Sequence, residues 1–300
     1  MSQIDDLNSK YGQVDDVRFC LSNEIYAGYE EALPVMVVEN KLAKLVMALN
    51  GAHIMSYVPA GGEDMFWLSP KSRLAEGVPV RGGIPLCTPW FGVHPDGLPM
   101  HGFARIMNWN VDQIENMENG ATKVVLSLSD TPSTRSMWPH AFAMHFDVVV
   151  GSKLQLDLAI TNHSQTPAHF ECAFHTYFNV GDVKNTTVEG LDGCTYIDMG
   201  HGKVQKQQQG SVMVDGIIQN LYVDVSPIQF VKSPAGNYKI EGSGHCALVW
   251  NCGDNDRNVP DIGAGNHKGY LCVERVDAAE WAVNIEPGES YATVMILSRE

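Results

Sequence analysis

An alternation of apolar and polar residues is the main periodic pattern along the chain. In KLQLDLAITN, residues 153–162, every second residue from Leu154 to Ile160 is leucine or isoleucine. A period of two is typical of a strand with one buried face. Similar segments, rich in β-branched residues, predict further strands at 33–40, 123–130, 145–152 and 291–300.

Turn signals separate these segments, and helical periodicity is weak. Residues 44–62 predict two strands that meet at Asn50-Gly51, a dipeptide typical of hairpins. A 3.6-residue apolar period lasts no more than a turn or two, so we expect few helices and only short ones. We therefore predict an all-β, mostly antiparallel sandwich, with loops at one edge forming a cleft. It would be a single domain over residues 1–300, in which 1–30 form an N-terminal extension or an edge segment.

The charge balance limits the class of partner. The 300 residues include 20 Lys and Arg against 35 Asp and Glu, a formal net charge of -15. This charge repels nucleic acid and anionic membranes, so we expect neither as a partner. It also repels anionic small molecules at long range. An anionic substrate would therefore need a local basic site.

The N-terminus and the cysteines bear on the compartment. The start, MSQIDDLNSKYGQVDD, has neither the basic nor the apolar region of a signal peptide, and no run of about 18 apolar residues occurs in the chain. The seven cysteines are scattered and form no CxxC pair, which favours reduced, buried thiols over disulfides or zinc ligands. We therefore expect a cytoplasmic protein, and a monomer rather than an obligate oligomer.

Two strand-like segments carry side chains suited to proton transfer. In ECAFHTYFNVGD, residues 171–182, His175 and Tyr177 would share the face opposite the core. In GYLCVERVDAAEWAV, residues 269–283, Glu274 lies in an otherwise apolar strand, where a carboxylate is costly to bury unless it is paired. The histidine could be a hydrogen-bonded structural residue and the glutamate half of an ion pair, for example with the neighbourhood of Arg275. Alternatively, they could be an acid and a base with pKa values tuned by their surroundings.

The segment RGGIPLCTPWFGVHPDGLPMHGFAR, residues 81–105, combines a fixed backbone with two basic ends. Two glycines follow Arg81 and permit a positive φ or a close backbone approach, and four prolines stiffen the rest. A Trp-Phe pair offers flat apolar surface for packing or for stacking on a sugar ring. Arg81 and Arg105 carry planar guanidinium groups that match phosphate geometry. The alternative is that each arginine forms a separate surface salt bridge.

Other reaction classes lack their motifs. The chain contains no GxSxG, no GxxxxGK[ST] and no GxGxxG after a strand. The histidine pairs 94/101 and 140/145 come without the cysteine or carboxylate pattern of a zinc site. We therefore expect no metal and no cofactor.

Six motifs carry a family resemblance. In chain order, RGGIPLCTPWFG, LPMHGFAR, MWPHAF, AFHTYFNVGD, LVWN and LCVE together resemble the hexose-6-phosphate mutarotases, also called glucose-6-phosphate 1-epimerases, of the aldose 1-epimerase (galactose mutarotase) superfamily. The resemblance extends from about residue 33 to the C-terminus. It implies a galactose mutarotase-like β-supersandwich with the active site in an open cleft on one sheet. It also implies an isomerase that interconverts the α and β anomers of a hexose 6-phosphate, with glucose 6-phosphate as the first candidate.

The resemblance also implies roles for individual residues. His175 of FHTYF falls on the catalytic acid of the family, and Glu274 of CVE falls on the catalytic base. Arg81 and Arg105 fall on positions that contact the substrate and supply the phosphate site. His101 of HGFAR falls where the wider superfamily has a histidine near the sugar.

Two positions depart from the family pattern. Asp215 of VDGIIQN would match a substrate-binding Asp of a VDR-Y motif, but this chain lacks the Arg and Tyr of that motif. Met100 replaces a glutamine that contacts substrate in some members, so a hydrogen bond is lost there. These departures concern the choice of hexose phosphate rather than the reaction type.

The implied reaction requires two proton transfers. A base takes the proton of the C1 hydroxyl, and an acid on the opposite side protonates the ring oxygen, so that the C1–O5 bond opens and recloses on the other face. Three alternatives remain open from the sequence. The first is an aldose 1-epimerase that acts on unphosphorylated sugars, the second is a non-catalytic phosphosugar-binding regulator on the same fold, and the third is a glycoside hydrolase with two carboxylates.

Overall fold

The structure, a computed structural model, describes residues 2–300 and consists mainly of antiparallel sheets. Within these residues the α-helices are α1 (Gln3–Tyr11) and α2 (Pro132–Met137). A capping box between Ser2 and Asp5 begins α1. No helix in this part of the chain is both long and apolar enough to cross a membrane. The expectation of few, short helices is therefore confirmed.

Three sheets contain most of the strands. The four-stranded sheet has the order β1 (Val17–Leu21), β2 (Pro34–Glu39), β3 (Ala43–Ala48), β4 (His53–Pro59). The nine-stranded sheet has the order β16 (Val212–Met213), β13 (Thr187–Glu189), β18 (Ile228–Ser233), β19 (Gly236–Gly242), β23 (Ser290–Arg299), β9 (Leu154–Asn162), β8 (Phe142–Val150), β7 (Thr122–Ser129), β6 (Asn110–Asn116).

The eight-stranded sheet is the one that carries the candidate site. It has the order β15 (Val204–Gln207), β14 (Thr195–Asp198), β17 (Ile218–Tyr222), β20 (Cys246–Asn251), β21 (Tyr270–Asp277), β11 (Cys172–Phe174), β5 (Leu86–Cys87), with β12 (Tyr177–Asn179) also paired to β21. A further pair joins β10 (Ala168–Phe170) to β22 (Val283–Ile285).

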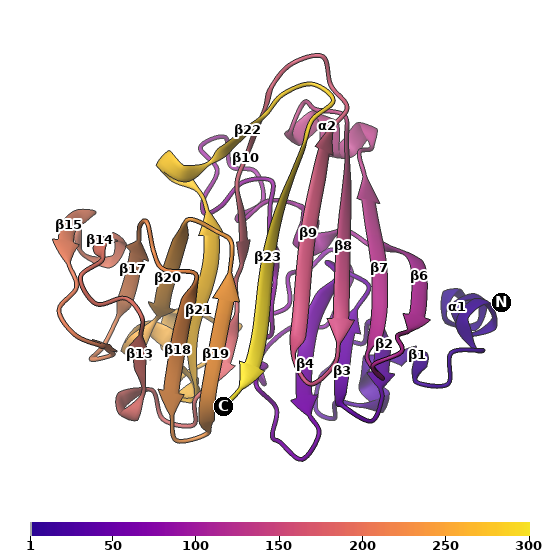
Figure 1. Cartoon of the computed structure of the whole chain (residues 1–300), viewed down its shortest axis with the longest axis horizontal. Helices are drawn as coiled ribbons and strands as arrows, with labels where there is room; N and C mark the ends of the chain where they lie inside the picture. Colours follow the sequence, from indigo (N-terminus) through magenta and orange to yellow (C-terminus); the bar gives the residue numbers. More distant parts are fainter. Residues whose placement is uncertain (1) are drawn as a thin grey trace.

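The main apolar core lies between the sheets. It joins Met47 of β3, Phe146 of β8, Ile240 of β19 and Val273 of β21 in one buried cluster. In Figure 1, the nine-stranded sheet extends from β13 and β18 to β6, with β2–β4 over one part of it and β17, β20 and β21 over the other. This two-layer arrangement is the predicted sandwich.

The predicted strands recur with shifts at their ends. Strand β9 alternates buried and half-buried residues along its whole length, as its period of two predicts. Strands β3 and β4 pair on either side of the turn at Asn50-Gly51, which confirms the hairpin. The segment 171–182 is the exception, because it divides into β11 and β12 with an interruption at His175 and Thr176.

Candidate active site

The candidate site lies on the face of the eight-stranded sheet that points away from the main core. Strand β21 is buried on both faces, with Leu271 and Val273 in the core between the sheets. Its other face carries Tyr270 and Cys272, which belong to a separate aromatic cluster with Tyr177. The other members of that cluster are Trp67, Trp250, Cys252, Val259 and Ile262.

His175 and Glu274 meet on this outer face. Phe174 pairs with Arg275 and Tyr177 pairs with Cys272, so β11 and β12 keep one register along β21. This register places His175 beside Glu274, and their Nδ1 and Oε1 atoms lie 3.2 Å apart. The alignment is not that of a hydrogen bond, and neither atom has a hydrogen-bond partner within residues 2–300. The two groups are therefore direct neighbours. The reaction described above would instead place the acid and the base on opposite sides of the sugar.

Burial disfavours the charged forms of both Glu274 and His175. Burial raises the pKa of the Glu274 carboxyl well above its ordinary value. Burial also lowers the pKa of His175 well below its ordinary value, and the neighbouring His101, Arg81 and Arg105 lower it further. Burial therefore disfavours the carboxylate form of Glu274 and the imidazolium form of His175.

The ion-pair alternative for Glu274 fails in its proposed form. Arg275 points to the opposite face of β21, where its Nη1 donates to Gln229 Oε1 at 2.7 Å. Both oxygens of Glu274 are fully buried and lack a hydrogen-bond partner among the described residues. An unpartnered buried carboxyl has no structural benefit that would account for its cost.

Arg81 enters the site beside the aromatic cluster. Its Nη1 donates to Tyr177 Oη at 2.7 Å, and its Nε donates to Asp261 Oδ2 at 3.0 Å. Its Nη2 also lies 2.9 Å from Asp261 Oδ2. The Tyr177 ring in turn stacks on His175, with centroids 4.8 Å apart and planes at 3°. Arg81 thus contacts the acid–base pair through a single tyrosine.

The two glycines after Arg81 fix its position. Gly82 and Gly83 have φ of 111° and 59°, a region that disfavours residues with a side chain. A Cβ on Gly83 would lie 2.0 Å from the carbonyl oxygen of Ile54, and one on Gly82 would lie 2.4 Å from that of Trp67. The predicted close backbone approach is confirmed.

Arg105 reaches the same site from the other end of the segment. Its Nη2 donates to the carbonyl oxygen of Met100 at 2.6 Å, and its buried Nε has no hydrogen-bond partner within residues 2–300. Burial lowers its pKa, with Arg81 contributing further. Within the same residues Arg105 forms no salt bridge. The salt-bridge alternative therefore holds for Arg81 but not for Arg105.

His101 packs against His175, with ring centroids 5.6 Å apart. The Gly92 N–H donates to its Nδ1 at 3.1 Å, so the neutral ring carries its proton on Nε2. Burial lowers the pKa of His101 to about 3. It therefore stays neutral at physiological pH and can donate one hydrogen bond.

Trp90 and Phe91, the aromatic pair of the 81–105 segment, lie in different surroundings. Trp90 is buried in the main core and donates from its indole to the carbonyl oxygen of Pro99. Phe91 is half-buried and packs on His101 at 4.8 Å between ring centroids. Of the two rings, only Phe91 stands beside the site.

Asp215 is not brought to this cluster. It is exposed in the turn before β17, which β20 separates from β21. The hydrogen bonds and salt bridges found within residues 2–300 include none between Asp215 and the other predicted site residues. Its substrate-binding role stays a prediction. Met100 is half exposed at the rim and contributes only its carbonyl oxygen to Arg105.

Sequence patterns assign no functional role to three residues of the site, although they place Cys272 on the same strand face as Glu274. Asp261 pairs with Arg81 from a loop 180 positions away, and VPDIGAG gives no local sign of this. Cys272 lies two residues before Glu274 and resembles any buried cysteine of a strand. Glu171 accepts hydrogen bonds from the Phe91 N–H at 2.7 Å and the Ala279 N–H at 2.8 Å, joining two loops at the site. Only its place directly before β11, the strand that leads to His175, could have drawn attention to it.

One set of side chains could in principle hold a metal ion. Potential ligand atoms of His175, Cys272 and Glu274 lie within 4.8 Å of one another. The nearby guanidinium groups of Arg81 and Arg105, which oppose the protonation of His175, equally oppose a bound cation. The expectation of no metal stays a prediction.

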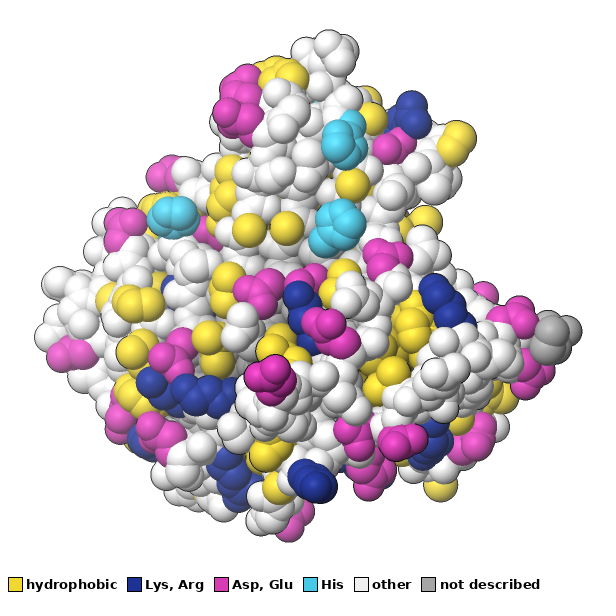
Figure 2. All heavy atoms as spheres, turned by 45° about the vertical axis from the view of Figure 1, so that its right-hand side comes forward, with side chains coloured by type: hydrophobic (Ala, Val, Ile, Leu, Met, Phe, Trp, Pro, Cys, Tyr) yellow, Lys and Arg dark blue, Asp and Glu magenta, His cyan; other side chains and the backbone are white. Residues whose placement is uncertain are grey.

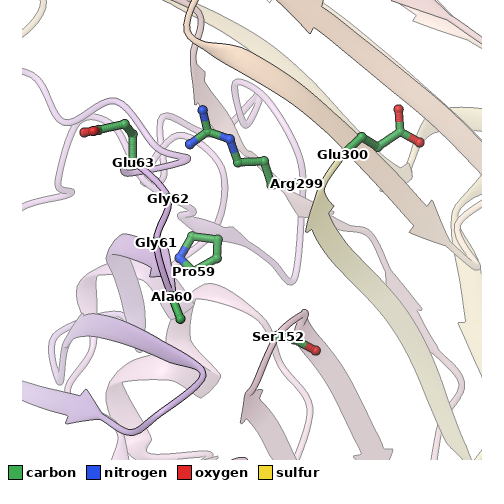
Figure 3. Close-up of a pocket in the computed structure, with 8 residues that line it drawn as sticks. All are labelled: Pro59, Ala60, Gly61, Gly62, Glu63, Ser152, Arg299 and Glu300. Atoms are coloured by element: carbon green, nitrogen blue, oxygen red, sulfur yellow. The ribbon is translucent and has the colours of Figure 1, made fainter.

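A hollow elsewhere on the surface is not related to these residues. Its volume is about 570 Å³, and it is lined by the Pro59–Glu63 turn, Ser152 and the C-terminal Arg299 and Glu300 (Figure 3). It contains none of the buried acid–base groups described above. This hollow is therefore not a candidate for the acid–base chemistry.

The sequence and the structure are similar to those of known proteins. The family model described as "Aldose 1-epimerase" matches residues 34–298. A Salmonella typhimurium protein named "Putative glucose-6-phosphate 1-epimerase" is 32% identical over 283 residues, which cover 89% of this chain and 92% of that protein. The crystal structure of "a putative mutarotase (YeaD)" from Salmonella typhimurium aligns with a TM-score of 0.83 at 27% identity, covering 89% of this chain and 90% of the other. A "galactose mutarotase related enzyme" from Lactobacillus acidophilus shares the fold, with a TM-score of 0.70 at 14% identity and coverage of 88% and 96%.

Proposed function

Since this chain belongs to the aldose 1-epimerase family, we propose that it interconverts the α and β anomers of a hexose 6-phosphate. The family makes it an isomerase on a galactose mutarotase-like β-sandwich, as the sequence predicted. The name of the 32% identical relative supports glucose 6-phosphate as the substrate to test first.

The single observation that carries this proposal is the buried His175–Glu274 pair. Anomerisation requires an acid and a base that act on the ring oxygen and on the C1 hydroxyl, two atoms bonded to the same carbon. Adjacent groups can therefore serve both atoms from one side of the sugar. An adjacent carboxyl and imidazole suit this reaction, because one group can donate a proton while the other accepts one, and ring closure reverses the transfers.

The remaining residues hold the sugar in this proposal. Arg105 offers an uncompensated charge and an unpartnered buried donor, which suits a phosphate group. Neutral His101 donates a hydrogen bond to a sugar hydroxyl, and Phe91 provides flat apolar surface beside it. In this proposal Arg81 also binds the substrate, through N–H groups that Tyr177 and Asp261 do not occupy.

We also propose that the protein works in the cytoplasm as a monomer. All seven cysteines are free thiols, and all but Cys194 are buried, which suits a reducing compartment. The net charge of -15 disfavours nucleic acid and anionic membrane as partners, leaving the hexose phosphate as the expected ligand.

Exchange spectroscopy tests the catalytic pair directly. NMR exchange between the α and β anomers of glucose 6-phosphate should accelerate with the wild-type protein and lose at least 100-fold of that acceleration in His175→Asn and Glu274→Gln, because each proton transfer contributes about 10²–10⁴-fold. Glu274→Gln should keep or raise the melting temperature, since it removes an unpartnered buried carboxyl. Near wild-type exchange in either folded variant would contradict the roles of these residues.

The same experiment separates the alternatives. Saturable glucose 6-phosphate binding without accelerated exchange would indicate a binding protein. Faster exchange of free glucose than of glucose 6-phosphate would indicate an epimerase for unphosphorylated sugars.

A further inference from the structure

The two arginines of the site differ in how their charge is compensated. All the hydrogen-bonding nitrogens of Arg81 are already engaged, Nη1 with Tyr177 and Nε and Nη2 with Asp261. Arg105 has no carboxylate partner within residues 2–300, and its Nε has no acceptor. The site therefore has two guanidinium groups but only one uncompensated positive charge.

Asp261 is held in place to make this pair. Its backbone carbonyl accepts a hydrogen bond from Ser69 Oγ at 2.6 Å, and the buried Ser69 also accepts from the Lys71 N–H. The Ser69 N–H in turn donates to the carbonyl oxygen of Arg81. Ser69 thus connects the backbone beside the carboxylate to the backbone beside the guanidinium. The ion pair belongs to a fixed arrangement and is not a chance surface contact.

The carboxylate also adds negative charge where an anion must approach. The molecule as a whole is acidic, with a formal net charge of -15. The face in Figure 2 shows Asp and Glu side chains spread among fewer basic ones. A phosphate dianion near Arg81 would meet Asp261 at the same guanidinium group. A neutral sugar would meet no such opposition.

We propose that Asp261 is a specificity-determining residue, which neutralises Arg81 and so limits how strongly the site prefers a phosphorylated over a neutral sugar. This rests on the proposed function, because it concerns the substrate class of the same site. The side chains of Arg81 and Asp261 are 24% and 37% exposed, so water screens the pair in part. We therefore expect a moderate effect on anion affinity, on the order of tenfold.

Calorimetric titration with inorganic phosphate tests the electrostatic part without turnover. The full-length protein at low ionic strength is compared with Asp261→Asn, which keeps an acceptor oxygen for Arg81 but removes the charge. Phosphate should bind about tenfold more tightly to this variant, and the ratio of kcat/KM for glucose 6-phosphate to that for glucose should rise about tenfold. Asp261→Glu should restore weaker phosphate binding, and Asp261→Ser replaces the Asn variant if that one does not fold.

The matched control is Asp254→Asn, which removes the same charge from the same loop. Asp254 is exposed and lies 3.6 Å from His267, and the ion pair of Arg81 is with Asp261. Its substitution should change phosphate affinity by less than about twofold. Unchanged or weaker phosphate binding in Asp261→Asn would overturn the proposal, as would an equal gain in the Asp254 control. A chain that fails to accelerate the exchange of any sugar would refute the proposed function, while the phosphate titration would still decide the role of Asp261.

Discussion

Individual residues of this site derive their chemistry from burial. Glu274 is excluded from solvent without a hydrogen-bond partner among the described residues, and His175 beside it is almost as deeply buried. In water each group would be charged or uncharged according to its own pKa. Here burial disfavours the charged form of both groups, and because they lie 3.2 Å apart the protonation of one affects that of the other. Sequence could predict these residue types, but only the register of β11 and β12 on β21 could place them 3.2 Å apart.

Removal of the Arg105 side chain should show whether the site recognises the phosphate group of its substrate. Arg105→Ala should lower kcat/KM for glucose 6-phosphate by about 10–100-fold, the usual range for a lost hydrogen bond to a charged group. The loss for free glucose should stay below about threefold, because that sugar has no phosphate to lose. Exchange rates over a concentration series of each sugar provide both values.

The control for this variant is Arg18→Ala, an exposed arginine on β1 outside the site. It removes the same charge, so it reports any effect of net charge alone. Equal losses on the two sugars in Arg105→Ala would contradict a phosphate contact.

Strands and turns show where sequence patterns are sufficient and where they fail. The period of two was enough for β9 and for the hairpin of β3 and β4, since burial of one face determines both. It could not predict the interruption between β11 and β12. There the His175 N–H donates to the carbonyl oxygen of Pro85, a residue 90 positions earlier in the chain. A tertiary hydrogen bond of this kind leaves no local periodicity.

The Arg81 turn is an element whose glycines can be tested. Gly83→Ala should lower the free energy of unfolding by about 2–4 kcal/mol, because a Cβ would lie 2.0 Å from the Ile54 carbonyl oxygen in addition to its positive φ. Its backbone also accepts a hydrogen bond from the Tyr177 N–H, so the same shift would disturb the site. Urea unfolding gives the stability change.

Gly97→Ala is the matched control within the same segment. Gly97 has a φ of 71°, but a Cβ there would meet nothing within 4 Å. Only the conformational cost remains, and we expect about 1 kcal/mol. Equal costs in the two variants would mean that close approach is unimportant at Gly83.

At the scale of the whole molecule, the fold assembles a basic site within an acidic protein. The sequence identified Arg81 and Arg105 as the exceptions to a net charge of -15. It could not identify Asp261 as the partner of one of them, because no pattern joins positions 81 and 261 until the loop after β20 packs against the Arg81 turn. The number of strands and their order in the sheets could not be predicted either. Hydrophobic periodicity indicates which face of a strand is buried, but not which strands pair with each other.

The molecule also buries neutral histidines, and this should determine its response to acid. His53 is fully buried, its Nε2 donates to the Gly82 carbonyl oxygen at 2.8 Å, and burial lowers its pKa to about 3. The ordinary value is 6.5, so between these two values the unfolded chain binds more protons than the folded one. Stability therefore falls as the pH decreases from 6.5 toward 3, and His101 contributes in the same sense. Glu274 contributes in the opposite sense, since its raised pKa makes the folded state bind its proton first as the pH falls.

Substitution of His53 isolates one part of this acid response. At pH 5 each such histidine should cost about 2 kcal/mol relative to neutral pH, because one pH unit below the unfolded pKa corresponds to about 1.4 kcal/mol. His53→Gln keeps a donor for the Gly82 carbonyl but cannot take up a proton. In urea unfolding at pH 7.5 and pH 5, this variant should lose about 2 kcal/mol less than the wild type. The exposed His145→Gln should lose as much as the wild type. A full wild-type loss in His53→Gln would show that the buried imidazole does not couple folding to pH, and that other groups cause the acid sensitivity.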